Sequence, residues 1–174
     1  MSILKIARMG HPVLRAMARA LDRTELRSPV VQRLIDDMID TMVEYHGVGL
    51  AAPQVHESVR IFVALLGPDD ENASSEPAVI VNPEIVPVGG DAVEGWEGCL
   101  SIPDIRGRVP RAREIVLRAL NRQGDGVELA LQDFPARVAQ HETDHLDGVL
   151  FVDRMRAFES LTFLDEYSRY WAKD

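Results

Sequence analysis

Residues 140–145 carry the residue types and spacing of a metal-dependent hydrolase. Their sequence, QHETDH, contains the pattern HExxH, in which two histidines stand four positions apart. Residues four apart share one face of a helix, so the imidazoles of His141 and His145 can bind the same ion. Glu142 directly follows the first histidine, where its carboxylate can act as a general base on a water at the metal. The pattern therefore predicts a hydrolytic metal site.

A catalytic site of this kind needs a third protein ligand and an open position for water. No histidine follows His145, so a histidine-rich extension of the motif is absent. Downstream carboxylates that could serve are Asp147, Asp153, Glu159, Asp165 and Glu166. Cys99, which precedes the motif, is the single cysteine of the chain, and a lone cysteine is more often a small buried apolar residue. The residues alone leave the third ligand open.

Three helices are expected to position these groups. Residues 29–46 form the clearest one, since Ser28 is a plausible N-cap, Gly47 supplies the stop, and apolar residues recur at helical spacing. Those apolar residues, expected in the core, are Val31, Leu34, Ile35, Met38, Ile39, Met42 and Val43. The metal motif lies on a second helix, which is predicted to open near Asp133 as N-cap and to end at Gly148. A last helix is predicted over residues 157–171.

Short β-branched runs between the first two helices predict strands, at residues 60–66, 78–82, 85–88, 114–120 and 127–132. The polar stretch 67–77 is expected to be a loop. We therefore expect an α+β fold, with small mixed or antiparallel sheets packed around a central metal-binding helix and with a C-terminal helix.

Composition limits the kinds of partner. The 174 residues, 46% hydrophobic and 27% charged, suit one globular domain over residues 1–174. A net charge of −9 argues against nonspecific binding of nucleic acid, and no direct nucleic-acid motif is present, although a local basic patch would still allow transient ribosome contact. The single cysteine excludes an intrachain disulfide. Without a signal peptide or an apolar run of about 20 residues, we expect a cytoplasmic protein without membrane contact, unless a transit peptide was removed.

Three segments, taken in order, resemble the peptide deformylase family. They are residues 47–54 (GVGLAAPQ), residues 97–101 (EGCLS) and residues 140–145 (QHETDH), and residues 10–15 (GHPVLR) also look like the family's N-terminal signature. The resemblance spans about residues 6–152. It implies a single catalytic domain that hydrolyses the N-formyl group from the formylmethionine of nascent polypeptides and releases formate.

The resemblance also implies the role of each site residue. Cys99, His141 and His145 would hold one divalent metal, with water as fourth ligand. The family favours Fe(II), while the same ligands also suit Zn(II), Ni(II) and Co(II). Glu142 would be the general base and acid.

An oxyanion site and a substrate pocket follow from the same resemblance. Gln54 and the backbone N–H of Leu100 would stabilise the oxyanion. Val48, Leu50 and Val138 would help to line a pocket for the methionine side chain, beside the close backbone approach that Gly49 allows. Arg106 would contact the substrate backbone.

Two further expectations concern the segment around Cys99. Glu97 and Arg111 are expected to form a buried ion pair that braces it. Trp96 stands where many relatives carry an acidic residue, so the mouth of the site is expected to be more apolar.

Two other functions are compatible with the metal motif. An ordinary HExxH zinc endopeptidase would cleave internal peptide bonds and would take a carboxylate or histidine as third ligand. A non-catalytic metal-binding or ribosome-associated protein would bind metal without hydrolysing a formyl-peptide.

Overall fold

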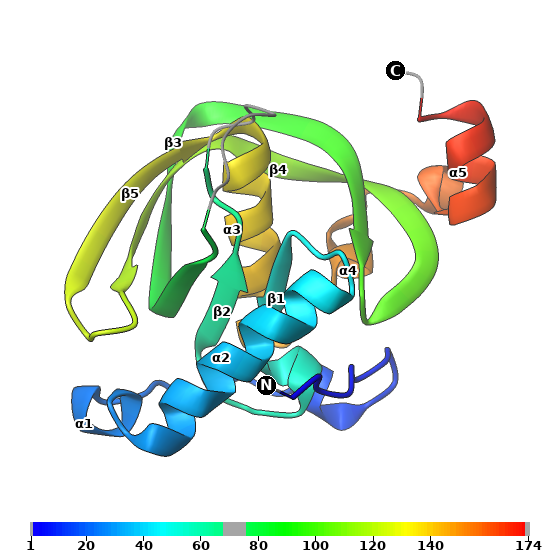
Figure 1. The fold of residues 1–174 in the computed structure, drawn as a ribbon. Coiled ribbons are helices and arrows are strands. Elements are labelled where there is room, and N and C mark those ends of the chain that lie inside the picture. Colours follow the sequence, from blue (N-terminus) through cyan, green and yellow to red (C-terminus); the bar gives the residue numbers. More distant parts are fainter. Residues whose placement is uncertain (1, 68–75, 173–174) are drawn as a thin grey trace.

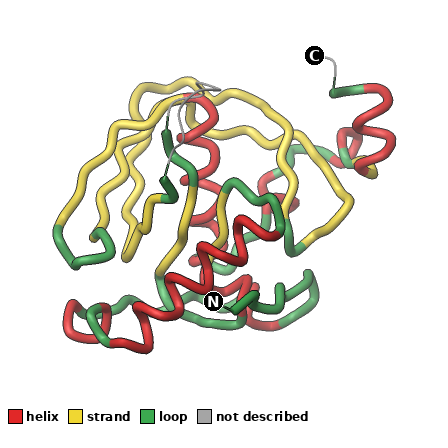
Figure 2. Tube along the Cα trace, in the orientation of Figure 1, coloured by secondary structure: helices red, strands yellow, loops and turns green. Residues whose placement is uncertain are grey.

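A central helix, α3 (Asp133–Leu146), lies in the concave face of a strongly curved antiparallel sheet (Figure 1). The structure is a computed structural model and describes residues 2–67 and 76–172. Figure 2 shows the strands as one curved layer with this helix inside the curve. Ala136 and Ala139 of α3 are fully buried, and such small side chains let the helix approach the sheet closely. The α+β prediction, with an antiparallel sheet around the motif helix, is confirmed.

The described part of the sheet has six strands, paired in the order β1-β2-β3-β4-β5, with β6 on β4. They are β1 (Gly49–Ala51), β2 (Ile61–Ala64), β3 (Ala78–Cys99), β4 (Ile102–Leu120), β5 (Gly126–Gln132) and β6 (Thr162–Phe163). A two-residue turn joins β3 to β4, since Cys99 pairs with Ile102. Three register shifts along the β3–β4 pair add local twist and help the sheet to curve.

The predicted strands at 78–82 and 85–88 are parts of the single strand β3, so their separation was wrong. Pro83, between the two predicted strands, and Pro87, within the second, both lie beyond the residues of β3 that pair with β2. There β3 has β4 as its partner and an open edge on the other side within the described pairing. Proline is tolerated at such an edge, because the missing N–H would not have joined a ladder.

The remaining helical segments flank this centre. They are η1 (Pro12–Arg15), α1 (Arg23–Leu26), α2 (Pro29–Glu44), η2 (Ala52–Val55), α4 (Phe151–Arg154), η3 (Phe158–Ser160) and α5 (Leu164–Tyr170). The predicted helix over residues 29–46 is confirmed as α2, and the Oγ of Ser28 accepts a hydrogen bond from the N–H of Val31. The apolar residues of α2 that were expected in the core pack against β1 and β2. Val43 is the exception, since it is 60% exposed at the end of the helix.

Two predicted helix boundaries were wrong. Asp133 is the first helical residue of α3, with a left-handed φ of 53°, and Gln132 is the N-cap without a side-chain hydrogen bond. The Asp133 carboxylate instead accepts a hydrogen bond from Arg113. Helix α3 ends at Leu146, and Gly148, with a φ of 73°, lies in the turn that follows it.

The predicted last helix over residues 157–171 is divided into η3, β6 and α5. Residues Thr162 and Phe163 pair with Arg106 and Ile105 of β4, and this tertiary pairing overrides the helical spacing of the local sequence. The predicted loop over residues 67–77 lies almost entirely outside the described residues. None of the described helices has both the length and the hydropathy that crossing a bilayer requires.

Candidate metal centre and active site

Three potential metal ligands from two distant segments meet beside α3. His141 and His145 lie on that helix, and Cys99 is the last residue of β3. Their candidate ligand atoms all lie within 4.8 Å of one another, and all three residues are buried. The Sγ of Cys99 lies 3.2 Å from the Nε2 of His145. The structure therefore brings together the three residues that were expected to hold the metal.

The surroundings of the Cys99 thiol favour its ionised form, the thiolate. Burial by itself raises the pKa of this thiol, but the imidazoles of His145 and His141 outweigh it and hold the pKa well below its usual value. The backbone N–H of Ser101 also donates to the sulfur at 3.4 Å. Since the thiolate is the form that binds metals, these contacts prepare Cys99 as a ligand.

The carboxylate of Glu97 orients one of the imidazoles. Its Oε2 lies 2.9 Å from the Nδ1 of His141, which leaves the Nε2 of that ring for the site. Arg111 donates to both carboxylate oxygens, at 2.9 and 3.0 Å, and Arg137 donates to Oε1 at 2.8 Å. The predicted buried ion pair between Glu97 and Arg111 is confirmed. Although burial raises the pKa of Glu97, its bonds to His141 and Arg111 hold that pKa well below its usual range.

Arg111 connects this carboxylate to α3 a second time. Its Nη1 lies 2.5 Å from the Oδ2 of Asp144, within the metal motif. Asp144 also accepts two hydrogen bonds from Arg154 of α4. The side chains of Glu97, Arg111 and Asp144 are each less than 10% exposed. Their ion pairs are therefore almost completely shielded from water.

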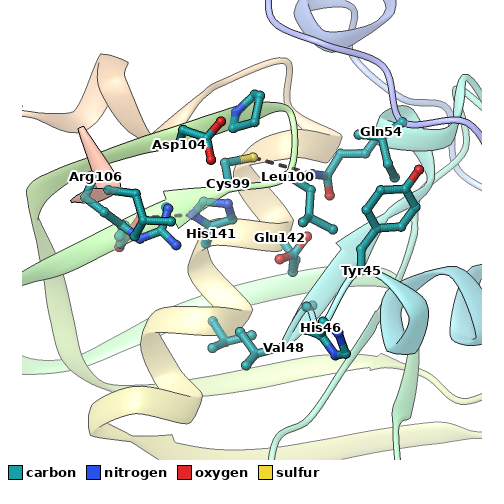
Figure 3. A pocket seen from close by; sticks show the side chains of 18 of the residues that line it. Tyr45, His46, Val48, Gln54, Cys99, Leu100, Asp104, Arg106, His141 and Glu142 are labelled. Atoms are coloured by element: carbon teal, nitrogen blue, oxygen red, sulfur yellow. Dashed lines mark hydrogen bonds and ion pairs between the residues drawn. The ribbon is translucent and has the colours of Figure 1, made fainter. Parts of the chain in front are cut away.

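Glu142 lines the cavity beside the ligand group (Figure 3). Its Oε2 is buried and has no hydrogen-bond partner among the described residues. Burial raises the pKa of this carboxyl group. A Cβ on Gly49 would collide with the Glu142 carboxylate, so glycine is what lets β1 pass this side chain. A carboxylate oxygen left without a partner at a buried site is a candidate proton acceptor.

Gln54 offers a fixed donor on the other side of Cys99 (Figure 3). Its Oε1 accepts from the N–H of Ala51 at 2.9 Å, which fixes the orientation of the amide. The Nε2 then lies 3.5 Å from the sulfur of Cys99 and 3.3 Å from the Oγ of Ser101. Leu100, the next residue after the thiol, also lines the cavity.

The cavity in front of these groups has a volume of about 750 Å³. It falls in the range of about 300–1,000 Å³ that is typical of sites for small ligands. The predicted substrate residues Val48, Gly49, Arg106 and Val138 all line it. Leu50 was wrongly expected there: it is fully buried and packs in the core with α2, because neighbouring residues of a strand point to opposite faces.

Several lining residues had no prediction from the sequence. They are Lys5, Ile6, Arg8, Tyr45, His46, Pro103, Asp104, Phe134, Arg137 and Leu164. A signal existed for Arg137, which precedes His141 by four residues and so shares its helix face. Leu164 lies at the cavity because β6 pairs with β4, and no local pattern in the sequence predicts that pairing.

One thiolate and two imidazoles fit a divalent transition metal, and such a set leaves a position open for water. Together with the buried carboxylate on the same helix, this arrangement is typical of a metal-dependent hydrolase. The sequence model of the polypeptide deformylase family matches residues 3–160. The chain belongs to this family, whose members are metal-dependent hydrolases that act on formylmethionyl peptides.

Individual relatives match over most of their length. Peptide deformylase 2 of Nostoc sp. is 41% identical over 175 residues, covering 99% of this chain and 97% of that protein. The Met-Ala-Ser-bound crystal structure of class I type b peptide deformylase from Acinetobacter baumannii superposes with a TM-score of 0.81 at 42% identity, covering 88% and 99% of the two chains. Peptide deformylase from Thermotoga maritima gives a TM-score of 0.81 at 38% identity, covering 90% and 100%.

Replacing Arg111 by methionine should destabilise the protein strongly. The change leaves Glu97 and Asp144 without their shared cation, and breaking a buried pair costs about 3–5 kcal/mol. Urea unfolding measures the free energy directly. The matched control is Arg118→Met, whose pair with Glu128 is exposed, and it should leave the unfolding midpoint unchanged. Equal stability of Arg111→Met and the wild type would contradict the role given to this network.

Proposed function

We propose that this chain removes the formyl group from the N-terminal formylmethionine of nascent polypeptides and releases formate. The observation that carries the proposal is the convergence of Cys99, His141 and His145 beside the Glu142 carboxylate, whose Oε2 has no hydrogen-bond partner among the described residues. A relative with Met-Ala-Ser bound shares the fold closely, and that peptide has the form of a deformylated N-terminus. The endopeptidase alternative is not favoured by these relationships.

Cys99, His141 and His145 would hold one divalent cation. When bound, the cation supplies Lewis acidity, which makes water a nucleophile near neutral pH and polarises the formyl carbonyl. We assign Fe(II) as the physiological ion, in keeping with the resemblance of the motifs. Zn(II), Ni(II) and Co(II) are other ions that the same ligands can bind.

Glu142 would move the proton. Its carboxylate accepts a proton from the water that attacks the formyl carbon, and the carboxyl group then donates it to the leaving methionine nitrogen. Burial, which raises the pKa of Glu142, makes it a better acceptor in the first step. The unpartnered Oε2 leaves an oxygen available for both transfers.

Gln54 and the backbone N–H of Leu100 would stabilise the oxyanion. Negative charge develops on the carbonyl oxygen as the formamide is attacked, and one preorganised donor there is typically worth about 3–4 kcal/mol. The bond from Ala51 to the Oε1 of Gln54 turns the amide nitrogen toward Cys99 before substrate arrives. This fixed orientation removes the need for reorganisation during the reaction.

The cavity walls would hold the substrate. We propose that Val48 and Val138 contact the methionine side chain, that Gly49 lets the peptide approach β1, and that Arg106 contacts the substrate backbone. We further propose that the enzyme works in the cytoplasm, on chains that emerge from the ribosome, which it would touch only transiently.

Formate release from formyl-Met-Ala-Ser tests the proposal and the role of Glu142 together. The metal-replete wild type should release formate, and Glu142→Ala should reduce kcat at least about 100-fold, because general acid–base catalysis contributes factors of this size. The variant should keep its metal. Glu128→Ala, an exposed change on β5, is the control and should match the wild type. A metal-replete wild type that releases no formate would exclude deformylation.

Oxygen sensitivity tests the assignment of iron. Ferrous iron beside the Cys99 thiolate is oxidisable, so protein purified in air should have lower turnover than protein purified without oxygen. Activity per bound metal ion is the quantity to compare. Equal values from the two preparations would contradict Fe(II), while leaving the deformylation itself intact.

A further inference from the structure

The C-terminal segment contributes to the wall of the catalytic cavity. The family match ends at residue 160, before β6 and α5. Leu164, the first residue of α5, nevertheless lines the same cavity as Val48 and Val138. This part of the chain, which lies beyond the family model although the Nostoc relative aligns with 99% of the chain, therefore adds a surface to the cavity.

Strand pairing places this surface beside Arg106. Thr162 of β6 pairs with Arg106 of β4, and Leu164 follows only two residues later. Arg106 is the residue proposed above to contact the substrate backbone. If Arg106 contacts the substrate backbone as proposed, Leu164 lies beside the path of the peptide that follows the methionine.

Trp96 completes the wall from the opposite strand of the hairpin. It lines the cavity and is half-buried, and its ring packs edge-on against Tyr167 of α5, with the ring centroids 5.0 Å apart. Trp171 lies 5.9 Å from the same ring, and the Arg108 guanidinium lies 6.0 Å from its centroid. Helix α5 thus covers one side of the indole and leaves another side toward the cavity.

We propose that Trp96 and Leu164 form a specificity wall that selects an apolar side chain at the residue after methionine. The inference rests on the proposed deformylation. Both side chains are apolar, so an apolar residue packed on them leaves water, whereas a small residue leaves the wall uncovered. The cavity of about 750 Å³ has room for peptide beyond the methionine side chain.

The test compares kcat/KM for formyl-Met-Leu-Ser and formyl-Met-Ala-Ser on the metal-loaded, full-length protein. The wild type should prefer the leucine peptide. The ratio of the two kcat/KM values should fall about fivefold in Trp96→Ala and in Leu164→Ala. This change is smaller than the discrimination of an enclosed apolar pocket, because the wall is open on one side. Phe163→Ala is the control: this side chain is 64% exposed and is not among the described residues that line the cavity, so the ratio should stay at the wild-type value.

The outcomes separate the inference from the proposed function. If the wild type hydrolyses neither peptide, deformylation itself is wrong. If it hydrolyses both and the ratio is the same in the wild type and both wall variants, deformylation stands and the specificity wall is wrong. Circular dichroism checks the fold of each variant. Should Trp96→Ala fail to fold, Leu164→Ala decides the question, because Leu164 is only partly buried at the start of α5.

Discussion

The site depends on one buried carboxylate, that of Glu97, which joins the β3–β4 hairpin to the central helix. It accepts both hydrogen bonds of the Arg111 fork, a third from Arg137, and contacts the Nδ1 of His141. An unpaired charge at this depth would be costly, so these partners must be present together. The same contacts set the ring of His141 at a fixed angle, and Cys99, two residues along β3, is placed by the same stretch of backbone.

The metal site requires the β3–β4 hairpin and helix α3 to lie close together. The thiolate and the two imidazoles must lie close together, although Cys99 and His141 are separated by the whole of β4 and β5. The hairpin must therefore bend back onto α3, and the register shifts along β3 and β4 allow that curvature. Gly49 also fits this arrangement, since a Cβ at this position would collide with the Glu142 side chain where it now lies.

The sequence predicted helix α2 and the two histidines of the metal motif from short-range signals, whereas Cys99 was expected as a ligand only from the family resemblance. Helical spacing and a serine cap located α2, and the spacing of His141 and His145 put both on one helix face. The sequence-based prediction failed where pairing between residues far apart in the chain determines the secondary structure. The two strands predicted on either side of Pro83 are one strand, because the open edge of β3 tolerates a proline there. Residues 162–163 were predicted to be helical, but they pair with β4. The cavity residues from α5 depend on that pairing and so could not be foreseen.

The central claim is that the Cys99 thiolate binds the metal together with the two histidines. Titration of the metal-free protein with Co(II), followed by near-ultraviolet and visible absorption, tests it most directly. We predict a thiolate-to-cobalt charge-transfer band that saturates at one equivalent, and its loss in Cys99→Ala with an unchanged fold. Binding of one Co(II) by the wild type without this band, or an identical spectrum in the variant, would contradict the account.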